Sequence, residues 1–254
     1  MAAKRGQVTA FVIIGAVILA MTGFVFYLIS GGGEEVSESE LEAESVKLFI
    51  SSCVRSTAIE AIFYIGEHGG YYAPPEPYKD YMGKSIPYYY FLEETYVPDV
   101  SSVEEGLSRY ISAELPECTN DFEAFTEQGY AIEEGNVSAR VNVTDDNVIF
   151  EVDYPVELVT GDSRQSIKSY IKTIDIDLKD KLRIAGDIAE KQKETGNKLP
   201  LSFLLDLAHY EGFTYNITDF PQPDYGLDLI FEEEPFTEPF VLSFVIGQGW
   251  GDAD

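Results

Sequence analysis

An uncharged apolar run near the N-terminus constrains this chain more than any other feature. Residues 8–30 form a stretch of 23 residues without an acidic or basic side chain. As an α-helix rising about 1.5 Å per residue, the run spans a hydrocarbon core about 30 Å thick. A cleaved secretory signal is the alternative, but its apolar region runs only about 7–15 residues and ends at a small-residue cleavage site. We therefore predict a transmembrane helix at residues 8–30, with the lipid bilayer as its partner.

The charges on either side predict the orientation of this helix. Lys4 and Arg5 precede it, whereas all 45 acidic residues follow it. Because cytoplasmic flanks of membrane helices carry the excess of Lys and Arg, residues 1–7 are expected to form a cytoplasmic tail. Three glycines open a flexible joint at residues 31–36, since glycine favours neither a helix nor packing. Residues 37–254 then form an acidic extracytoplasmic domain.

The composition bounds the classes of partner. The formal net charge is −28, so the surface repels phosphates, and a nucleic-acid partner is excluded. Hydrophobic residues make up 45% of the chain and aromatic residues 13%, which is typical of a packed core rather than of a disordered segment.

The residues just before the apolar run resemble a known processing signal. Residues 4–7 read Lys-Arg-Gly-Gln and lead directly into the run. This resembles the class III signal of archaeal type IV pilin-like proteins, in which a prepilin peptidase cuts between Gly and Gln. The resemblance implies a processing site between Gly6 and Gln7, with the retained helices packing into a filament core. Family pilins carry a Glu at the fifth mature position, where this chain has Phe11.

Two further motifs widen this resemblance. Phe-Ile-Ser-Ser-Cys ends at Cys53, and residues 68–72 read His-Gly-Gly-Tyr-Tyr. This layout looks like archaeal membrane-anchored surface proteins with the same N-terminal start, a family to which no activity is attached. The resemblance therefore implies location rather than chemistry.

The hydrophobic periodicity predicts an α+β domain of several helices packed on antiparallel sheets. The expected helices lie at 37–65, 101–115, 177–195 and 200–209, and the expected strands at 130–133, 136–143, 148–158, 213–217, 227–231 and 240–246. Ser101 or Ser102 is expected to cap the second helix, and Pro116 to break or restart it. The prolines of residues 71–100 exclude a regular helix there. A boundary that would divide the domain 37–254 into two parts is considered near residues 160–176.

The two cysteines, Cys53 and Cys118, lie on two different expected helices. Outside the cell, thiols tend to oxidise, so we predict a disulfide that joins the first helix to the second. Two free buried thiols, each behaving as a small apolar residue, are the alternative.

Three sequons mark candidate glycosylation sites in an exported domain. Asn136, Asn142 and Asn216 each stand two residues before Ser or Thr. Buried strands can hold such triplets unmodified, which leaves the glycoprotein interpretation open.

Familiar catalytic signatures do not occur in the sequence. It lacks a nucleophile elbow, a zinc-protease motif and phosphate-binding loops. His68 and His209 stand at expected helix ends, where histidine commonly contacts the last carbonyls. The acidic groups at 144–147 and 175–180 lack EF-hand spacing and read as a hairpin turn and a helix cap. We expect no metal and no cofactor, and an acid-pair hydrolase remains only an alternative.

A tyrosine-rich segment is the most unusual feature of the expected domain. Eight of the 17 tyrosines fall between residues 71 and 96. Exposed tyrosines are common in protein and glycan recognition, so the candidate partner-binding residues are Tyr71, Tyr72, Tyr78, Tyr88, Tyr89 and Tyr90. The alternative is a segment that buries these rings against the core.

The leading functional interpretation is a membrane-anchored cell-surface protein of the adhesion or envelope-interaction type. Its expected partners are other surface proteins or glycans, and self-association is left open. A type IV pilin-like filament subunit and a membrane-anchored envelope hydrolase are the alternatives.

Overall fold

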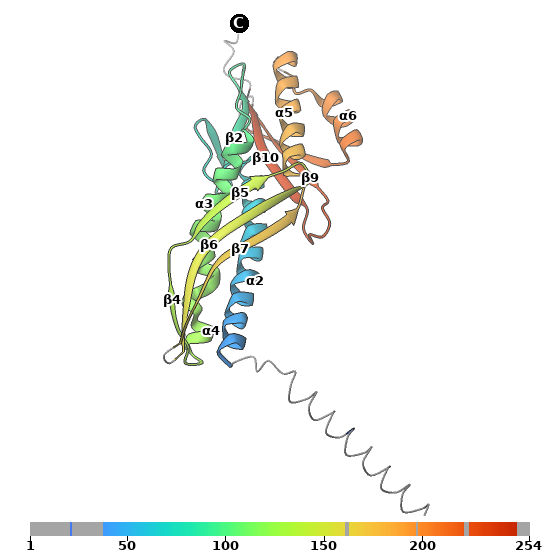
Figure 1. Ribbon diagram of the computed structural model, residues 1–254. Helices are drawn as coiled ribbons and strands as arrows, with labels where there is room; N and C mark the ends of the chain where they lie inside the picture. The colour runs from blue at the N-terminus through green and yellow to red at the C-terminus, as the bar shows by residue number, and fades with distance from the viewer. Residues whose placement is uncertain (1–20, 22–37, 161–162, 197, 221–223, 248–254) are drawn as a thin grey trace, which may run out of the picture. The chain divides into compact units, whose positions relative to one another are not determined.

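The computed structural model describes residues 21, 38–160, 163–196, 198–220 and 224–247 (Figure 1). The chain divides into two compact units, Met1–Glu44 and Ser45–Asp254. The second unit combines helices with antiparallel and mixed sheets, which confirms the α+β expectation. The expected membrane helix, tail and joint lie outside the described residues, with the exception of Met21.

Helix α2, Glu38–Glu67, is the central helix of the fold and confirms the first expected helix. Its fully or almost fully buried stripe consists of Val46, Ile50, Val54, Ala58, Ala61, Ile62 and Ile65. The N–H of Gly70 donates to the carbonyl of Ile65 at 2.7 Å and closes the last turn. Gly69 is required there, because its φ is +56° and a Cβ would meet Pro87 and the Ser243 carbonyl within 2.7 Å.

Part of α2 is also long and apolar enough to cross a membrane. Among the described residues, this holds for one helix, over Ala43–Glu67. Its apolar stripe packs against the domain, so burial in the core accounts for its composition. The expected span at residues 8–30 is a different segment and stays a prediction.

Helix α3, Val100–Thr119, is joined to α2 by the expected disulfide between Cys53 and Cys118. Its N-cap is Asp99, whose carboxylate accepts from the Ser102 N–H at 2.7 Å, so the expectation of a serine cap is wrong. Pro116 lies inside the helix, and the expected break is wrong as well. The disulfide and the Thr119 hydroxyl, which donates to the Pro116 carbonyl at 2.9 Å, hold the turn after the proline.

The first sheet consists of β4, Ala131–Glu134, β5, Ser138–Val143, β6, Asn147–Thr160, and β7, Ser163–Asp175. The first three of these strands are confirmed expectations, whereas β7 was not expected. Strand β7 is polar in sequence and buries few apolar side chains, among them Tyr170 and Ile174. Its Lys172 ammonium donates to the Ser51 hydroxyl of α2 at 2.5 Å, which places this sheet against the N-terminal half of α2. Residues 160–176, where the sequence left room for a subdivision, thus run mostly within β7.

The second sheet has the order β1-β2-β10-β9-β8, with β3 also paired to β2. Its strands are β1, Tyr78–Tyr81, β2, Lys84–Phe91, β3, Glu94–Thr95, β8, Thr214–Asp219, β9, Asp224–Phe231, and β10, Phe240–Gly247. The last three confirm expected strands. Strands β1 to β3 fall in the proline-rich segment that the sequence left without a regular element. Strand β2 runs parallel to β10, and the other pairs are antiparallel.

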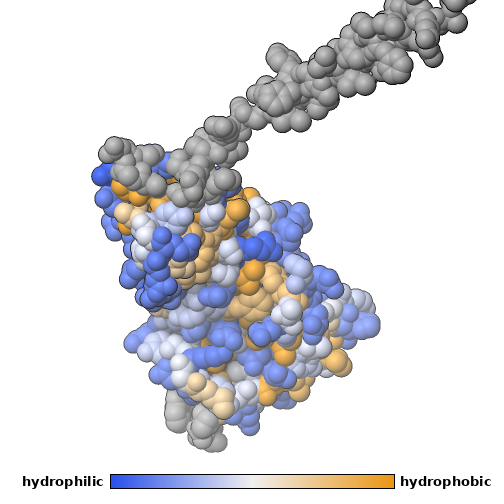
Figure 2. All heavy atoms as spheres, turned by 90° about the horizontal axis from the view of Figure 1, so that it is seen from below, coloured by the Kyte–Doolittle hydropathy of each residue, from blue (hydrophilic) through white to orange (hydrophobic). Residues whose placement is uncertain are grey.

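Helices α5, Leu178–Thr195, and α6, Leu201–Glu211, confirm the two remaining expected helices. The buried Lys181 of α5 forms an ion pair with Glu233 at 2.5 Å and a second one with Asp177. Glu233 lies at the start of the β9–β10 loop, residues 232–239, so this pair fixes the loop to α5. Hydrophilic residues are spread over the face drawn in Figure 2, with groups of hydrophobic residues between them.

Candidate functional site

The structure separates the six tyrosines that the sequence nominated. Tyr88, Tyr89 and Tyr90 lie in β2 and are only 7%, 0% and 4% exposed. For these three rings the structure agrees with the alternative prediction, in which the segment buries its tyrosines against the core. Tyr78 is exposed on β1, and Tyr71 is half-buried with its hydroxyl donating to the Tyr96 carbonyl at 3.2 Å. The six rings therefore do not form one exposed surface.

Tyr72 belongs to a different group of rings, which α2 and α3 build together. The Tyr64 ring of α2 lies 4.9 Å from the Tyr110 ring of α3 and 5.9 Å from the Tyr72 ring. His68, one turn after Tyr64, stacks on it at 4.1 Å, and its Nδ1 lies 2.8 Å from the Tyr64 carbonyl. His68 thus has the helix-end contact expected from the sequence. All four rings are half-buried, so each keeps part of its surface in contact with solvent.

These rings continue into a cleft of about 420 Å³. We call it the aromatic cleft; it is lined by Ile59, Glu60, Phe63, Tyr64, Glu67, Tyr110, Phe236, Thr237 and Glu238. Two ring pairs stand in it: Tyr64 with Tyr110, and Phe63 with Phe236, whose centroids are 5.4 Å apart. The loop residue Phe236 is positioned locally by its N–H, which donates to the Glu233 carbonyl at 2.9 Å.

The electrostatics of the cleft are set by neutral rings and by carboxylates. Burial raises the pKa of the Tyr64 hydroxyl, and the neighbouring Tyr72 and Glu114 raise it further. Burial, followed by Glu60 and Glu114, raises the pKa of the Tyr110 hydroxyl in the same way. Both phenols are therefore protonated at physiological pH, and the formal charges that line the cleft come from its glutamates.

Comparisons with family models, with curated proteins and with solved structures find no match. The chemistry of the cleft is therefore argued from its own residues.

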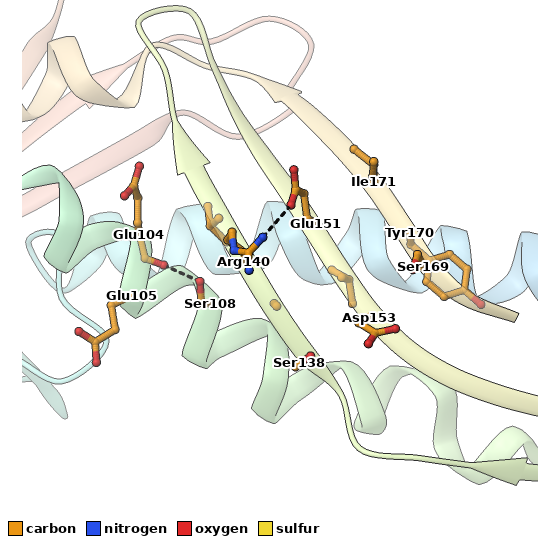
Figure 3. A pocket seen from close by; sticks show the side chains of 13 residues that line it. Glu104, Glu105, Ser108, Ser138, Arg140, Glu151, Asp153, Ser169, Tyr170 and Ile171 are labelled. Carbon is orange, nitrogen blue, oxygen red and sulfur yellow. Dashed lines mark hydrogen bonds and ion pairs between the residues drawn. The ribbon is translucent and has the colours of Figure 1, made fainter.

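A larger groove, of about 750 Å³, is lined by α3 and by strands β5, β6 and β7 of the first sheet (Figure 3). Figure 3 shows Arg140 of β5 directed toward Glu151 of β6, and the two side chains pair at 3.6 Å. Glu104 of α3 accepts a hydrogen bond from the Val143 N–H of the edge strand at 2.8 Å. The Glu104 contact satisfies a backbone N–H at the edge of the sheet, which is a structural role, so we do not nominate this groove as the functional site.

The other candidate residues stand apart from the aromatic cleft. The sequon residues Asn136, Asn142 and Asn216 are all exposed, so each could accept a glycan sterically, and their modification stays a prediction. His209 is exposed on α6. Among the described residues, no group of three or more His, Cys, Asp or Glu could hold a metal ion.

Sequence reasoning did not nominate Tyr110, Tyr64, Phe63 or Phe236 as site residues. The sequence pattern gave little indication of Phe63 and Tyr64, because they lie beside the buried apolar stripe of α2 rather than on it. Phe236 comes from a loop whose position depends on the Lys181–Glu233 pair. Only the packing of α2, α3 and this loop brings the four rings together.

Proposed function

We propose that this chain is a membrane-anchored surface protein whose extracytoplasmic domain binds a partner in the cell envelope or on another cell. In this proposal residues 8–30 span the bilayer, with the N-terminus in the cytoplasm. The aromatic cleft and the adjoining Tyr72 form the contact surface. The observation that carries the proposal is the convergence of half-buried rings from α2, α3 and the β9–β10 loop on one cleft.

The ring chemistry supports recognition. Tyrosine and phenylalanine offer large contact areas with few rotatable bonds, and such aromatic residues are enriched where protein surfaces meet. The Tyr72 and Tyr110 hydroxyls make no hydrogen bond to other described residues, which leaves them able to donate to a partner. A ring that is half-buried is also held in place before binding, which lowers the entropy lost in the complex.

The disulfide supports the expected location. Disulfides persist in oxidising compartments and are rare in the reducing cytosol. Cys118 is exposed, so cytosolic reductants would reach the Cys53–Cys118 bond if the domain lay inside the cell.

The test is binding of the purified full-length protein, held in lipid nanodiscs, to envelope fractions of its own cells. We expect Tyr72→Ala and Tyr110→Ala each to weaken binding by about tenfold, the loss typical of a residue that matters at an interface. Tyr210→Ala is the matched control, because Tyr210 is 83% exposed on α6 and lies outside the cleft. Thermal melts confirm that each variant is folded. Unchanged binding of both cleft variants would remove the cleft from the proposal.

A pilin-like filament subunit is the second candidate, favoured by the Lys-Arg-Gly-Gln sequence at residues 4–7. It requires cleavage between Gly6 and Gln7. Peptide mapping of the protein from its native membranes distinguishes the two. A mature chain beginning at Gln7 favours the filament subunit, and a chain that retains Lys4 and Arg5 favours the simple anchor.

A further inference from the structure

The carboxylates around the aromatic cleft are not all paired within the chain. Glu67 forms an ion pair with Lys84 at 2.7 Å. Glu60 and Glu238 are exposed at the cleft and form no ion pair with any other described residue. Glu114 stands close enough to raise the pKa of both tyrosine hydroxyls. The cleft therefore joins aromatic faces to uncompensated negative charge.

Aromatic faces and carboxylates both attract cations. The negative face of a phenol or phenyl ring draws a cation that lies within about 6 Å of its centroid. The chain already makes such a contact beside the cleft, where the guanidinium carbon of Arg109 lies 4.8 Å from the Tyr72 ring centroid. An anionic group would instead meet the glutamates without a compensating charge.

We propose that the aromatic cleft recognises an arginine side chain presented by a partner protein. Arginine is favoured over lysine, because a planar guanidinium stacks on aromatic faces and binds a carboxylate with two hydrogen bonds at once. The aliphatic stem would pack against Phe63 and Phe236, and the guanidinium would reach Glu60 or Glu238. A volume of about 420 Å³ holds one side chain with part of its backbone and lies within the usual size range of small-ligand sites.

This inference rests on the proposed function, since it names the chemistry of the partner at the same cleft. The acidic surface complicates its test, because a chain of net charge −28 attracts any basic peptide. The experiment must therefore distinguish binding of arginine in the aromatic cleft from attraction of a basic peptide to the negative charge of the whole protein.

The probe is a short peptide, Gly-Arg-Gly, blocked at both ends and labelled with a neutral coumarin. Its binding to the full-length protein in nanodiscs is measured by fluorescence anisotropy at physiological salt. The control peptide carries citrulline, which has the shape of arginine without the charge. We expect the arginine peptide to bind about tenfold tighter, because both the cation–π and the carboxylate contacts need the positive charge.

Matched variants assign the effect to the cleft. We expect Glu60→Gln to weaken binding of the arginine peptide roughly threefold or more, the range of a partly exposed charge pair. Glu117→Gln changes the net charge equally, on an exposed residue of α3 that does not line the cleft, and should have no effect. Tyr110→Phe keeps an aromatic face and should retain binding, whereas Tyr110→Leu should lose it.

Equal binding of the arginine and citrulline peptides would overturn the inference, and so would equal effects of Glu60→Gln and Glu117→Gln. If the arginine peptide fails to bind while Tyr110→Ala still weakens envelope binding, the proposed function stands and only the arginine chemistry is wrong. If peptide binding does not depend on Tyr110, and neither Tyr72→Ala nor Tyr110→Ala changes envelope binding, the arginine inference fails and the cleft is removed from the proposed function.

Discussion

The same substitution is expected to have opposite effects at two helical glycines, Gly66 and Gly186. Gly66 lies in the last turn of α2, against β10. A Cβ at Gly66 would stand 2.5 Å from the Val241 carbonyl oxygen and 2.6 Å from the Phe240 ring. Gly186 lies within α5, where the nearest atom to a new Cβ is a Val97 methyl at 3.7 Å, an ordinary contact distance. Gly66→Ala therefore creates a clash and Gly186→Ala does not.

The magnitudes follow from two opposing terms. Alanine stabilises a helix interior by up to about 1 kcal/mol relative to glycine. Inserting a methyl into a packed core costs about 1–3 kcal/mol. At Gly66 the clash involves a backbone oxygen and a fully buried ring, neither of which can move away freely, so the upper end of this cost applies. We expect Gly66→Ala to lower the free energy of unfolding by about 2 kcal/mol and Gly186→Ala to raise it by up to about 1 kcal/mol.

The measurement is urea unfolding of the full-length protein in detergent, followed by far-ultraviolet circular dichroism. The free energy of unfolding must fall with urea concentration at the same slope in the wild type, Gly66→Ala and Gly186→Ala, so that a shift of the midpoint reports a change in stability. A Gly66→Ala variant as stable as the wild type would refute the packing of α2 against β10. Because Phe240 also lies 6.2 Å from the cleft residue Phe63, that result would also weaken the described position of the cleft wall.

Two further predictions concern the cross-link and the buried phenols. Replacing both Cys53 and Cys118 by alanine opens a loop with a sequence separation of 65 residues and should cost about 4 kcal/mol on the chain-entropy model. Urea unfolding measures this loss, and an unchanged midpoint would contradict it. Burial raises the pKa of Tyr89 well above 10.0, and burial with the Asp224 hydrogen bond raises that of Tyr88. The folded state thus keeps these protons after the unfolded state loses them, so the stabilisation is full below about pH 10 and is lost as pH rises through the folded pKa values. Circular dichroism with absorbance at the phenolate band should show that the last tyrosines to ionise do so together with unfolding, whereas ionisation of all 17 tyrosines in the still-folded protein would contradict the prediction.

The sequence alone predicted the elements whose periodicity is strong. The helices that became α2, α3, α5 and α6 could be placed because a repeat of apolar residues on one face survives in any amphipathic helix. Strands β9 and β10 could be placed because they are short apolar runs between turn residues. The disulfide was predicted from two cysteines on different expected helices of a domain that we expect to be exported.

Packing overruled one local rule, at Pro116, and formed two strands, β2 and β7, that the sequence did not predict. Helix α3 continues through Pro116, although the proline cannot donate to the Ser112 carbonyl, and the disulfide and Thr119 hold the turn after it. Strand β2 contains Pro87, yet it forms, because its neighbours β1, β3 and β10 pair with the residues around the proline. Strand β7 has little apolar character of its own and is held by its long pairing with β6.

What the sequence by itself determined is the α+β class, the helix positions, the acidity of the domain and the identity of the cross-linked cysteines. These are local or compositional properties, and each can be read from neighbouring residues or from counts. Only the tertiary structure decided which tyrosines are buried and which line a cleft, because exposure depends on segments far apart in the chain. Tyr64, Tyr110 and Phe236 meet through the packing of two helices and a loop fixed by the Lys181–Glu233 pair, and no sequence spacing encodes that meeting.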